Sequence, residues 1–137
     1  MIQLTQDVID VRAVRDAVDD PGFGAILVFE GITRNHFDGR AVHELAYEAY
    51  EGMAIAELSA IASEAAERWP GVSVAIVHRL GIVPVGEASV VIAVGAPHRV
   101  EGYSASRFTI DALKERVPIW KKEIYADGSA WKANAPA

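Results

Sequence analysis

The stretch VSVAIVHRLGIVPVGEASVVIAV, residues 72–94, decides the fold of this chain. Its two ends, residues 72–79 and 87–94, are rich in apolar and β-branched side chains and predict two strands. The segment between them passes through Pro84 and Gly86, which favour a loop. Paired strands placed between helices favour an α+β fold with a largely antiparallel sheet over a Rossmann-type fold.

The segments on either side of this strand pair complete the pattern. Residues 53–69 form the clearest predicted helix, because apolar side chains recur there at helical spacing. Further elements are predicted as strands at 24–33 and 42–50, a polar loop at 35–40, a helix after Asp10, and a helix from about Ser104 to Arg116. The predicted order is αββαββα, with about three helices and room for short extra strands.

Length and composition fit one ordinary globular domain. The chain has 137 residues, 51% of them hydrophobic and 23% charged, so we expect a single domain over 1–137, with a flexible tail at about 132–137. No apolar run approaches the ~18 residues of a membrane span. The first ten residues lack the features of a secretory signal, so we expect a cytoplasmic protein. The net charge of -6 argues against a nucleic-acid partner.

The residue types that are missing limit the chemistry. The chain has no cysteine, which excludes disulfides, thiolate-bound metals and thiol nucleophiles. Its four histidines show no metal-ligand spacing, so we expect neither a metal ion nor a bound cofactor. Any reaction must therefore use lysine, arginine, histidine, carboxylate, tyrosine or hydroxyl groups.

A basic cluster stands out on this acidic chain. Four cations fall within nine positions of the segment IDALKERVPIWKKEIYADGSAW, residues 110–131: Lys114, Arg116, Lys121 and Lys122. Pro118 disfavours helix at the residue before it, so the helix that carries Lys114 should end there and Lys121 should lie on a differently directed segment. Two lysines from different elements can converge on an anion. A solvated basic face at a helix C-terminus, where cations are favoured, explains the same charges.

Two further spots are suited to holding an anion. Arg34 leaves a predicted strand into a polar loop, where its guanidinium can fork onto a phosphate or carboxylate, although it also fits an ordinary surface arginine. His98 and Arg99 follow a strand at a strand-to-helix junction, where helix N–H groups attract anions, although helix capping explains them equally well. His78 shares a strand face with apolar neighbours and is predicted to be a packed, hydrogen-bonded histidine.

Seven segments, in order and at their spacing, give this chain a specific resemblance. They are GAILVFEGITRNH at 24–36, LAYEAYEGMA at 45–54, RWP at 68–70, HRLG at 78–81, HR at 98–99, LKERVPIWKKE at 113–123 and DGSAW at 127–131. Together they resemble the large, catalytic subunit of molybdopterin synthase over nearly the whole chain. The most specific feature is the LK pair followed seven residues later by the second lysine.

The resemblance implies a fold and an activity. It implies an α/β-hammerhead domain and a sulfurtransferase that converts cyclic pyranopterin monophosphate to molybdopterin. The sulfur would come from the C-terminal Gly-Gly thiocarboxylate of a small ubiquitin-like partner. Lys114 and Lys121 would lie at the reaction centre, and Arg34 would hold the substrate phosphate. His98 and Arg99 would reach the site from the second copy in a homodimer, the core of a heterotetramer.

Two other classes of function stay open. A small phosphate-ester or acyl-phosphate hydrolase would also use an arginine at a strand end, and would need no protein partner. A non-catalytic binding module would dock an acidic tail on the same basic cluster. The segment after Trp131 departs from the resemblance, because only Lys132 follows where family members often carry more basic residues.

Overall fold

The computed structural model of this chain describes residues 1–126 and 128–131. Its helices are α1 (Val11–Asp16), α2 (Glu51–Arg68) and α3 (Arg99–Arg116). Its strands are β1 (Ile2–Thr5), β2 (Ala25–Ile32), β3 (His36–Phe37), β4 (Arg40–Ala49), β5 (Ser73–Arg79), β6 (Gly81–Pro84), β7 (Ala88–Ala96), β8 (Ile119–Tyr125) and β9 (Gly128–Trp131). The expected flexible tail at 132–137 lies outside the described residues, as does Asp127.

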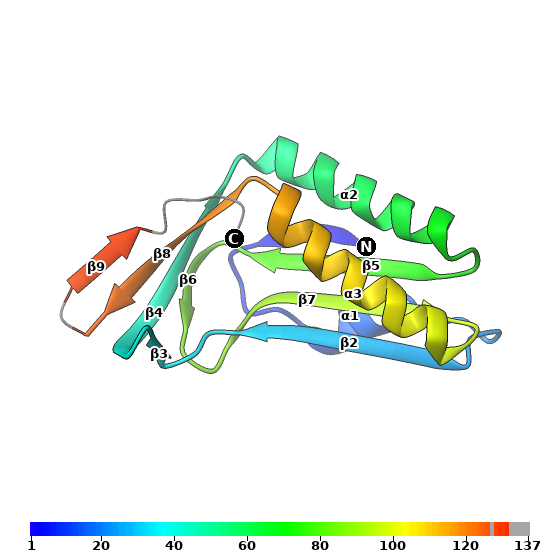
Figure 1. The fold of residues 1–137 in the computed structure, drawn as a ribbon, viewed down its shortest axis with the longest axis horizontal. Helices are drawn as coiled ribbons and strands as arrows, with labels where there is room; N and C mark the ends of the chain where they lie inside the picture. The colour runs from blue at the N-terminus through cyan, green and yellow to red at the C-terminus, as the bar shows by residue number, and fades with distance from the viewer. Residues whose placement is uncertain (127, 132–137) are drawn as a thin grey trace.

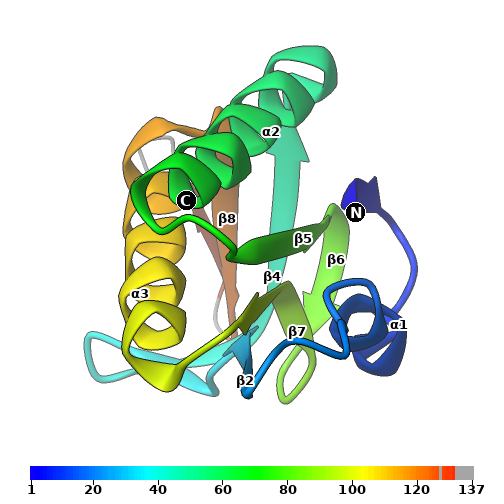
Figure 2. The ribbon, with the colours of Figure 1, turned by 90° about the vertical axis from the view of Figure 1, so that its right-hand side faces the viewer.

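The first sheet has the strand order β1-β5-β7-β2 and lies between two helical layers (Figure 1). Strands β5, β7 and β2 pair antiparallel, while β1 runs parallel to β5. Helices α2 and α3 lie on one face of this sheet, and α1 lies on the other (Figure 2). Successive side chains of a strand point to opposite faces of the sheet, so both faces carry apolar residues. Ile76 and Ile92 pack toward α2 and α3, whereas Val77 and Val91 pack toward α1.

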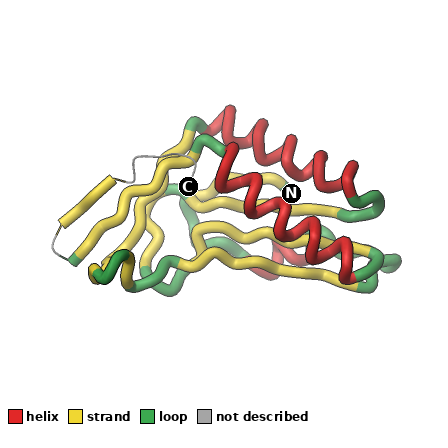
Figure 3. The backbone as a smooth tube through the Cα atoms, in the orientation of Figure 1, coloured by secondary structure: helices red, strands yellow, loops and turns green. Residues whose placement is uncertain are grey.

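The second sheet lies at one end of the first (Figure 3). Its order is β3-β4-β8-β9, and β6 also pairs with β4. All of these pairings are antiparallel. Strand β6 follows β5 after a single residue, so the chain turns there from the first sheet into the second.

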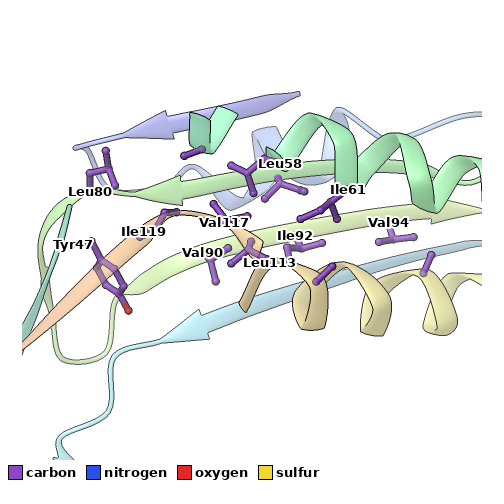
Figure 4. Close-up of a cluster of buried hydrophobic side chains, with 14 of the residues drawn as sticks. Tyr47, Leu58, Ile61, Leu80, Val90, Ile92, Val94, Leu113, Val117 and Ile119 are labelled. Atoms are coloured by element: carbon purple, nitrogen blue, oxygen red, sulfur yellow. The ribbon is translucent and has the colours of Figure 1, made fainter. Parts of the chain in front are cut away.

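The main core lies between the first sheet and the helix pair (Figure 4). Leu58 and Ile61 from α2 meet Ile92 from β7 and Leu113 from α3, and all four side chains are fully buried. Burying each such aliphatic side chain contributes roughly 1.5–3 kcal/mol, so this contact fixes α3 against the sheet. None of the helices in the described part of the chain is long and apolar enough to cross a membrane.

The predicted α+β class with three helices is confirmed, and the differences lie in short elements. The sheet is split in two, and strands β1, β3, β6, β8 and β9 extend the predicted order. The predicted loop through Pro84 is partly strand, because β6 pairs with β4. Helix α3 begins at Arg99 rather than near Ser104, since the Glu101 carboxylate accepts a hydrogen bond from the His98 N–H at 2.8 Å and caps an earlier first turn.

Candidate functional site

A pocket of about 180 Å³ opens where the two sheets meet the C-terminal half of α3. Its walls come from β2 and the loop after it, from β4, β7 and β8, and from α3. Three of the five site residues predicted from the sequence line it: Arg34, Lys114 and Lys121. Residues from three separate elements therefore meet in one cavity, as an anion-binding site requires.

Strand register brings Lys121 into this pocket. In the antiparallel pair of β4 and β8, Lys121 lies opposite Tyr47 and Glu123 lies opposite Leu45. Opposite residues of an antiparallel pair share a sheet face, and all four line the pocket. The neighbouring Lys122 belongs to the alternate face and is not among the lining residues.

Lys114 reaches the pocket from the last turn of α3. It lies one helical turn after Ile110, which lines the same pocket. The helix ends at Arg116 with Val117 as its C-cap, as Pro118 predicts. The residue keeps contact with solvent, but desolvation of the amine lowers the pKa of Lys114, and the nearby positive charge of Lys121 lowers it further. The predicted convergence of these two lysines is therefore a feature of the fold.

Arg116 does not belong to this site, although the sequence placed it in the same basic cluster. Its Nε donates to Glu57 Oε1 at 2.6 Å, and its Nη2 donates to Glu64 Oε2 at 2.6 Å. These hydrogen bonds raise the pKa of the guanidinium, with the bond to Glu64 the largest cause. Arg116 thus fastens the C-terminal end of α3 to α2.

Arg34 follows the end of β2, in a segment that is held by backbone hydrogen bonds. The preceding Thr33 donates its N–H to the Glu87 carbonyl at 3.1 Å and accepts the Gly86 N–H at 2.9 Å. Gly31 packs closely against β7, because a Cβ there would lie 2.7 Å from a methyl group of Val90. The Arg34 side chain is exposed and lines the pocket, so it is available to an incoming anion.

His98 and Arg99 lie at the opposite end of α3. Neither lines the pocket, and both are exposed. Arg99 and Lys114 are separated by 15 helical residues, which corresponds to roughly 22 Å along the axis. Within one chain, these two residues flank the start of the helix and do not join the lysines.

The sequence analysis did not predict Glu123 or Tyr47 as pocket residues, but both line the pocket. Glu123 is 2% exposed, lines the pocket and accepts a hydrogen bond from the Tyr125 hydroxyl, which raises the pKa of Tyr125. Tyr47 is buried between the pocket and His78, with the two ring centroids 5.0 Å apart. A strand at 119–125 would have revealed Glu123, because it alternates with Lys121.

His78 is confirmed as a packed histidine. It is 2% exposed, and its Nδ1 lies 2.8 Å from the Arg79 carbonyl oxygen. The pKa of His78 is lowered to about 4, mainly because burial removes the ring from solvent. The hydrogen bond to the Arg79 backbone raises the pKa, and the positive charge of Lys114 lowers it. A neutral imidazole therefore stands behind the pocket at neutral pH. Within residues 1–126 and 128–131, no three acidic or histidine side chains form a group that could hold a metal ion.

Comparisons with known proteins show which family this chain resembles. The family model described as MoaE protein matches residues 4–116. A molybdopterin synthase catalytic subunit from Drosophila virilis is 50% identical over 136 residues, covering 97% of this chain and 39% of that protein. The human protein of that name is 47% identical over 134 residues, covering 98% of this chain and 71% of its own length.

Solved structures agree as well. Molybdopterin synthase from Staphylococcus aureus matches with a TM-score of 0.92 and 40% identity, over 96% of each chain. A complex of subunits 1 and 2 of molybdopterin-converting factor from Helicobacter pylori matches in fold, with a TM-score of 0.80 and 23% identity, over 97% of this chain and 90% of that chain. The chain belongs to the family of molybdopterin synthase catalytic subunits.

Proposed function

We propose that this protein is a sulfurtransferase that converts cyclic pyranopterin monophosphate to molybdopterin. The observation that carries the proposal is the meeting of Arg34, Lys114 and Lys121 in one pocket, in a chain of this family. Each of these three side chains can carry a positive charge. Both reactants, the substrate phosphate and the partner's thiocarboxylate, are anionic. A pair of opposite charges 4 Å apart contributes about 4 kcal/mol at an effective dielectric of 20.

The sulfur comes from outside the chain. Without cysteine, this protein has no thiol on which to carry sulfur. The donor we propose is the C-terminal thiocarboxylate of a small ubiquitin-like partner, whose tail enters the pocket. The Helicobacter pylori complex of subunits 1 and 2 supports a two-subunit assembly, and we propose a heterotetramer built on a dimer of this chain.

Each lysine has a separate task in this mechanism. The thiocarboxylate sulfur attacks a substrate carbon, a carbon–sulfur bond forms, and a carbon–oxygen bond of the substrate breaks. We assign Lys121 to protonate that oxygen, and Lys114 to hold the thiocarboxylate end of the partner tail. Water then cleaves the acyl–sulfur bond and leaves the partner as a carboxylate, so each of the two sulfurs uses one partner molecule.

The remaining pocket side chains hold the substrate. Arg34 grips the substrate phosphate, which does not react, with its forked guanidinium. His98 and Arg99 complete the anion site from the second copy of this chain. We further propose that residues 1–137 form one catalytic domain that works in the cytoplasm, with neither a metal ion nor a bound cofactor.

The test is a sulfur-transfer assay with purified components. Thiocarboxylated partner and cyclic pyranopterin monophosphate are mixed with this protein, and the dithiolene product is detected by mass. Formation of the product, dependent on the thiocarboxylate, supports the proposal. Release of phosphate without any partner would instead indicate a hydrolase, and partner binding without product would indicate a binding module.

A further inference from the structure

Tyr47 lies in the wall of the pocket, and its ring is held by the packing behind it. The residue is 5% exposed and belongs to the main core cluster. Its ring packs edge-on against His78, with the ring centroids 5.0 Å apart and the ring planes at 73°. In Figure 4 the Tyr47 hydroxyl points away from Leu80. Packing of the ring therefore fixes the direction in which the hydroxyl points.

The Tyr47 hydroxyl has room for a further hydrogen bond. Its side-chain partner is Ser89, which also lines the pocket. Ser89 is 7% exposed and donates its Oγ–H to the Gly31 carbonyl at 3.3 Å. A hydroxyl offers one proton and two acceptor lone pairs, so one partner leaves capacity for another. Burial raises the pKa of Tyr47 more than the bond to Ser89 lowers it, so the group is a neutral hydroxyl at neutral pH.

Strand register places a donor beside this hydroxyl. Tyr47 and Lys121 lie directly opposite each other in the pair of β4 and β8, and both line the pocket. Opposite Cβ atoms lie roughly 4.5–5.5 Å apart, so the two long side chains extend into the pocket side by side. The lysine amine carries three donors and no acceptor, so it can donate to the Tyr47 oxygen. Lys114 comes from α3 and has no such register with Tyr47.

We propose that Tyr47 is a positioning residue that acts through Lys121: its hydroxyl accepts a hydrogen bond from the lysine amine and fixes the direction of that amine in the pocket. A lysine stem is flexible, and its amine takes many positions unless a partner holds it. A general acid must reach the atom that it protonates with a defined geometry. The positioning role rests on the function proposed above for Lys121, but the hydrogen bond itself does not.

The kinetic test uses Tyr47→Phe, which keeps the ring and its contact with His78 but removes the hydroxyl. Sulfur transfer is measured with thiocarboxylated partner at varied concentrations of cyclic pyranopterin monophosphate. We expect kcat to fall roughly tenfold, because a hydrogen bond to a charged group is lost, while KM stays within about twofold. Tyr50→Phe is the matched control, since Tyr50 is 63% exposed and is not among the lining residues. An unchanged kcat in Tyr47→Phe, with the natural chain active, overturns the proposal.

A double variant shows whether Tyr47 acts through Lys121. In the Lys121→Ala protein the amine is already gone, so adding Tyr47→Phe should change the residual rate by less than about twofold. A second tenfold loss in that protein would mean that Tyr47 touches the reactants or supports the fold, and it overturns the proposal. Ser89→Ala, which removes the hydroxyl that anchors Tyr47, should lower kcat in the same direction. It carries the comparison if circular dichroism shows that Tyr47→Phe does not fold.

Amine acylation tests the hydrogen bond without substrate or partner. Only a neutral amine is acylated, and a hydrogen bond to Tyr47 favours the charged form. After brief treatment with an acylating reagent, peptide masses give the labelling of Lys121 relative to its neighbour Lys122. This ratio should rise about two- to fivefold in Tyr47→Phe and stay unchanged in Tyr50→Phe. No rise at Lys121, or a rise at Lys114 instead, overturns the proposal. A natural chain that makes no dithiolene would contradict the proposed function, while this ratio still decides the hydrogen bond.

Discussion

The two ends of α3 carry similar cations in different surroundings. At its C-terminal end, Lys114 lines a pocket whose walls come from two sheets, and Arg116 is held by two carboxylates of α2. At its N-terminal end, His98 and Arg99 are exposed and line no part of that pocket. The difference teaches that the fold of one chain brings the cations at only one end of α3 into the pocket.

The largest effect is expected from removing a lysine at the C-terminal end of α3 or on β8, where the pocket lies. Lys121→Ala should lower the rate of dithiolene formation ~10²–10⁴-fold, because a general acid or base typically contributes that much. The rate is measured by product mass, with the unfolding temperature checked separately. Lys122→Ala is the matched control, since its side chain belongs to the other face of β8 and should leave the rate within about twofold. Equal losses in both variants would remove Lys121 from its special role.

A smaller effect is expected at Arg34. Its proposed phosphate contact is the same before and during the reaction, so Arg34→Ala should raise KM roughly 10–100-fold and change kcat little. Arg34→Lys should recover only part of this loss, because lysine lacks the forked pair of donors. Steady-state kinetics at varied substrate concentration measure both constants. An unchanged KM in Arg34→Ala would show that the phosphate binds elsewhere.

The sequence predicted the convergence of Lys114 and Lys121 because local rules determine it. Pro118 ends α3, and the lysines on either side of it must then lie on different elements. Arg116 shows the limit of this reasoning: its two carboxylate partners lie 52 and 59 residues away, and only the packing of α2 on α3 brings them to it. Glu123 was missed because no strand was predicted over 119–125.

The secondary structure was likewise predicted well where the local sequence pattern determines it. Strands with strong apolar runs, such as β5 and β7, were predicted with nearly correct bounds. Short strands such as β6 are defined by the strand they pair with, and the four residues of β6 carry too little pattern of their own. His98 and Arg99 were expected in the site only from the resemblance, and within one chain they are exposed and do not line the pocket.

The change in folding stability below neutral pH gives a third test, of His78 behind the pocket. The pKa of His78 is about 4 in the folded chain and near 6.5 when unfolded, so the unfolded chain binds the extra proton first as pH falls. Stability from this residue is present above pH 6.5 and is lost as pH falls toward 4, on the order of 3 kcal/mol at full extent.

His78→Asn should flatten this pH dependence. The asparagine amide can still donate to the Arg79 carbonyl, but it does not titrate. The free energy of unfolding is measured by urea titration between pH 4 and about 7.5. His43→Asn serves as the control, because the His43 side chain is 72% exposed and should leave the slope unchanged. A slope in His78→Asn equal to that of the natural chain would place the acid sensitivity elsewhere.

The smallest effect concerns the fastening of α3. Arg116→Gln removes the ion pairs to Glu57 and Glu64, so it should lower the unfolding temperature slightly and leave sulfur transfer within a few-fold of the natural rate. Arg12→Gln, which loses one exposed ion pair to Asp16, should lower it less. A deep loss of activity in Arg116→Gln, with stability unchanged, would place Arg116 in the site after all.

Subunit mixing tests most directly whether the two ends of α3 meet across two copies. Arg99→Ala and Lys121→Ala proteins should each be nearly inactive alone. When the two variants are mixed in equal parts, half of the dimers contain one chain of each variant. In such a dimer, one site carries both substitutions and the other site carries neither. The mixture should therefore recover roughly a quarter of the natural activity. No recovery, after exchange of subunits has been verified by mass, would show that each site is built within one chain and would contradict the account.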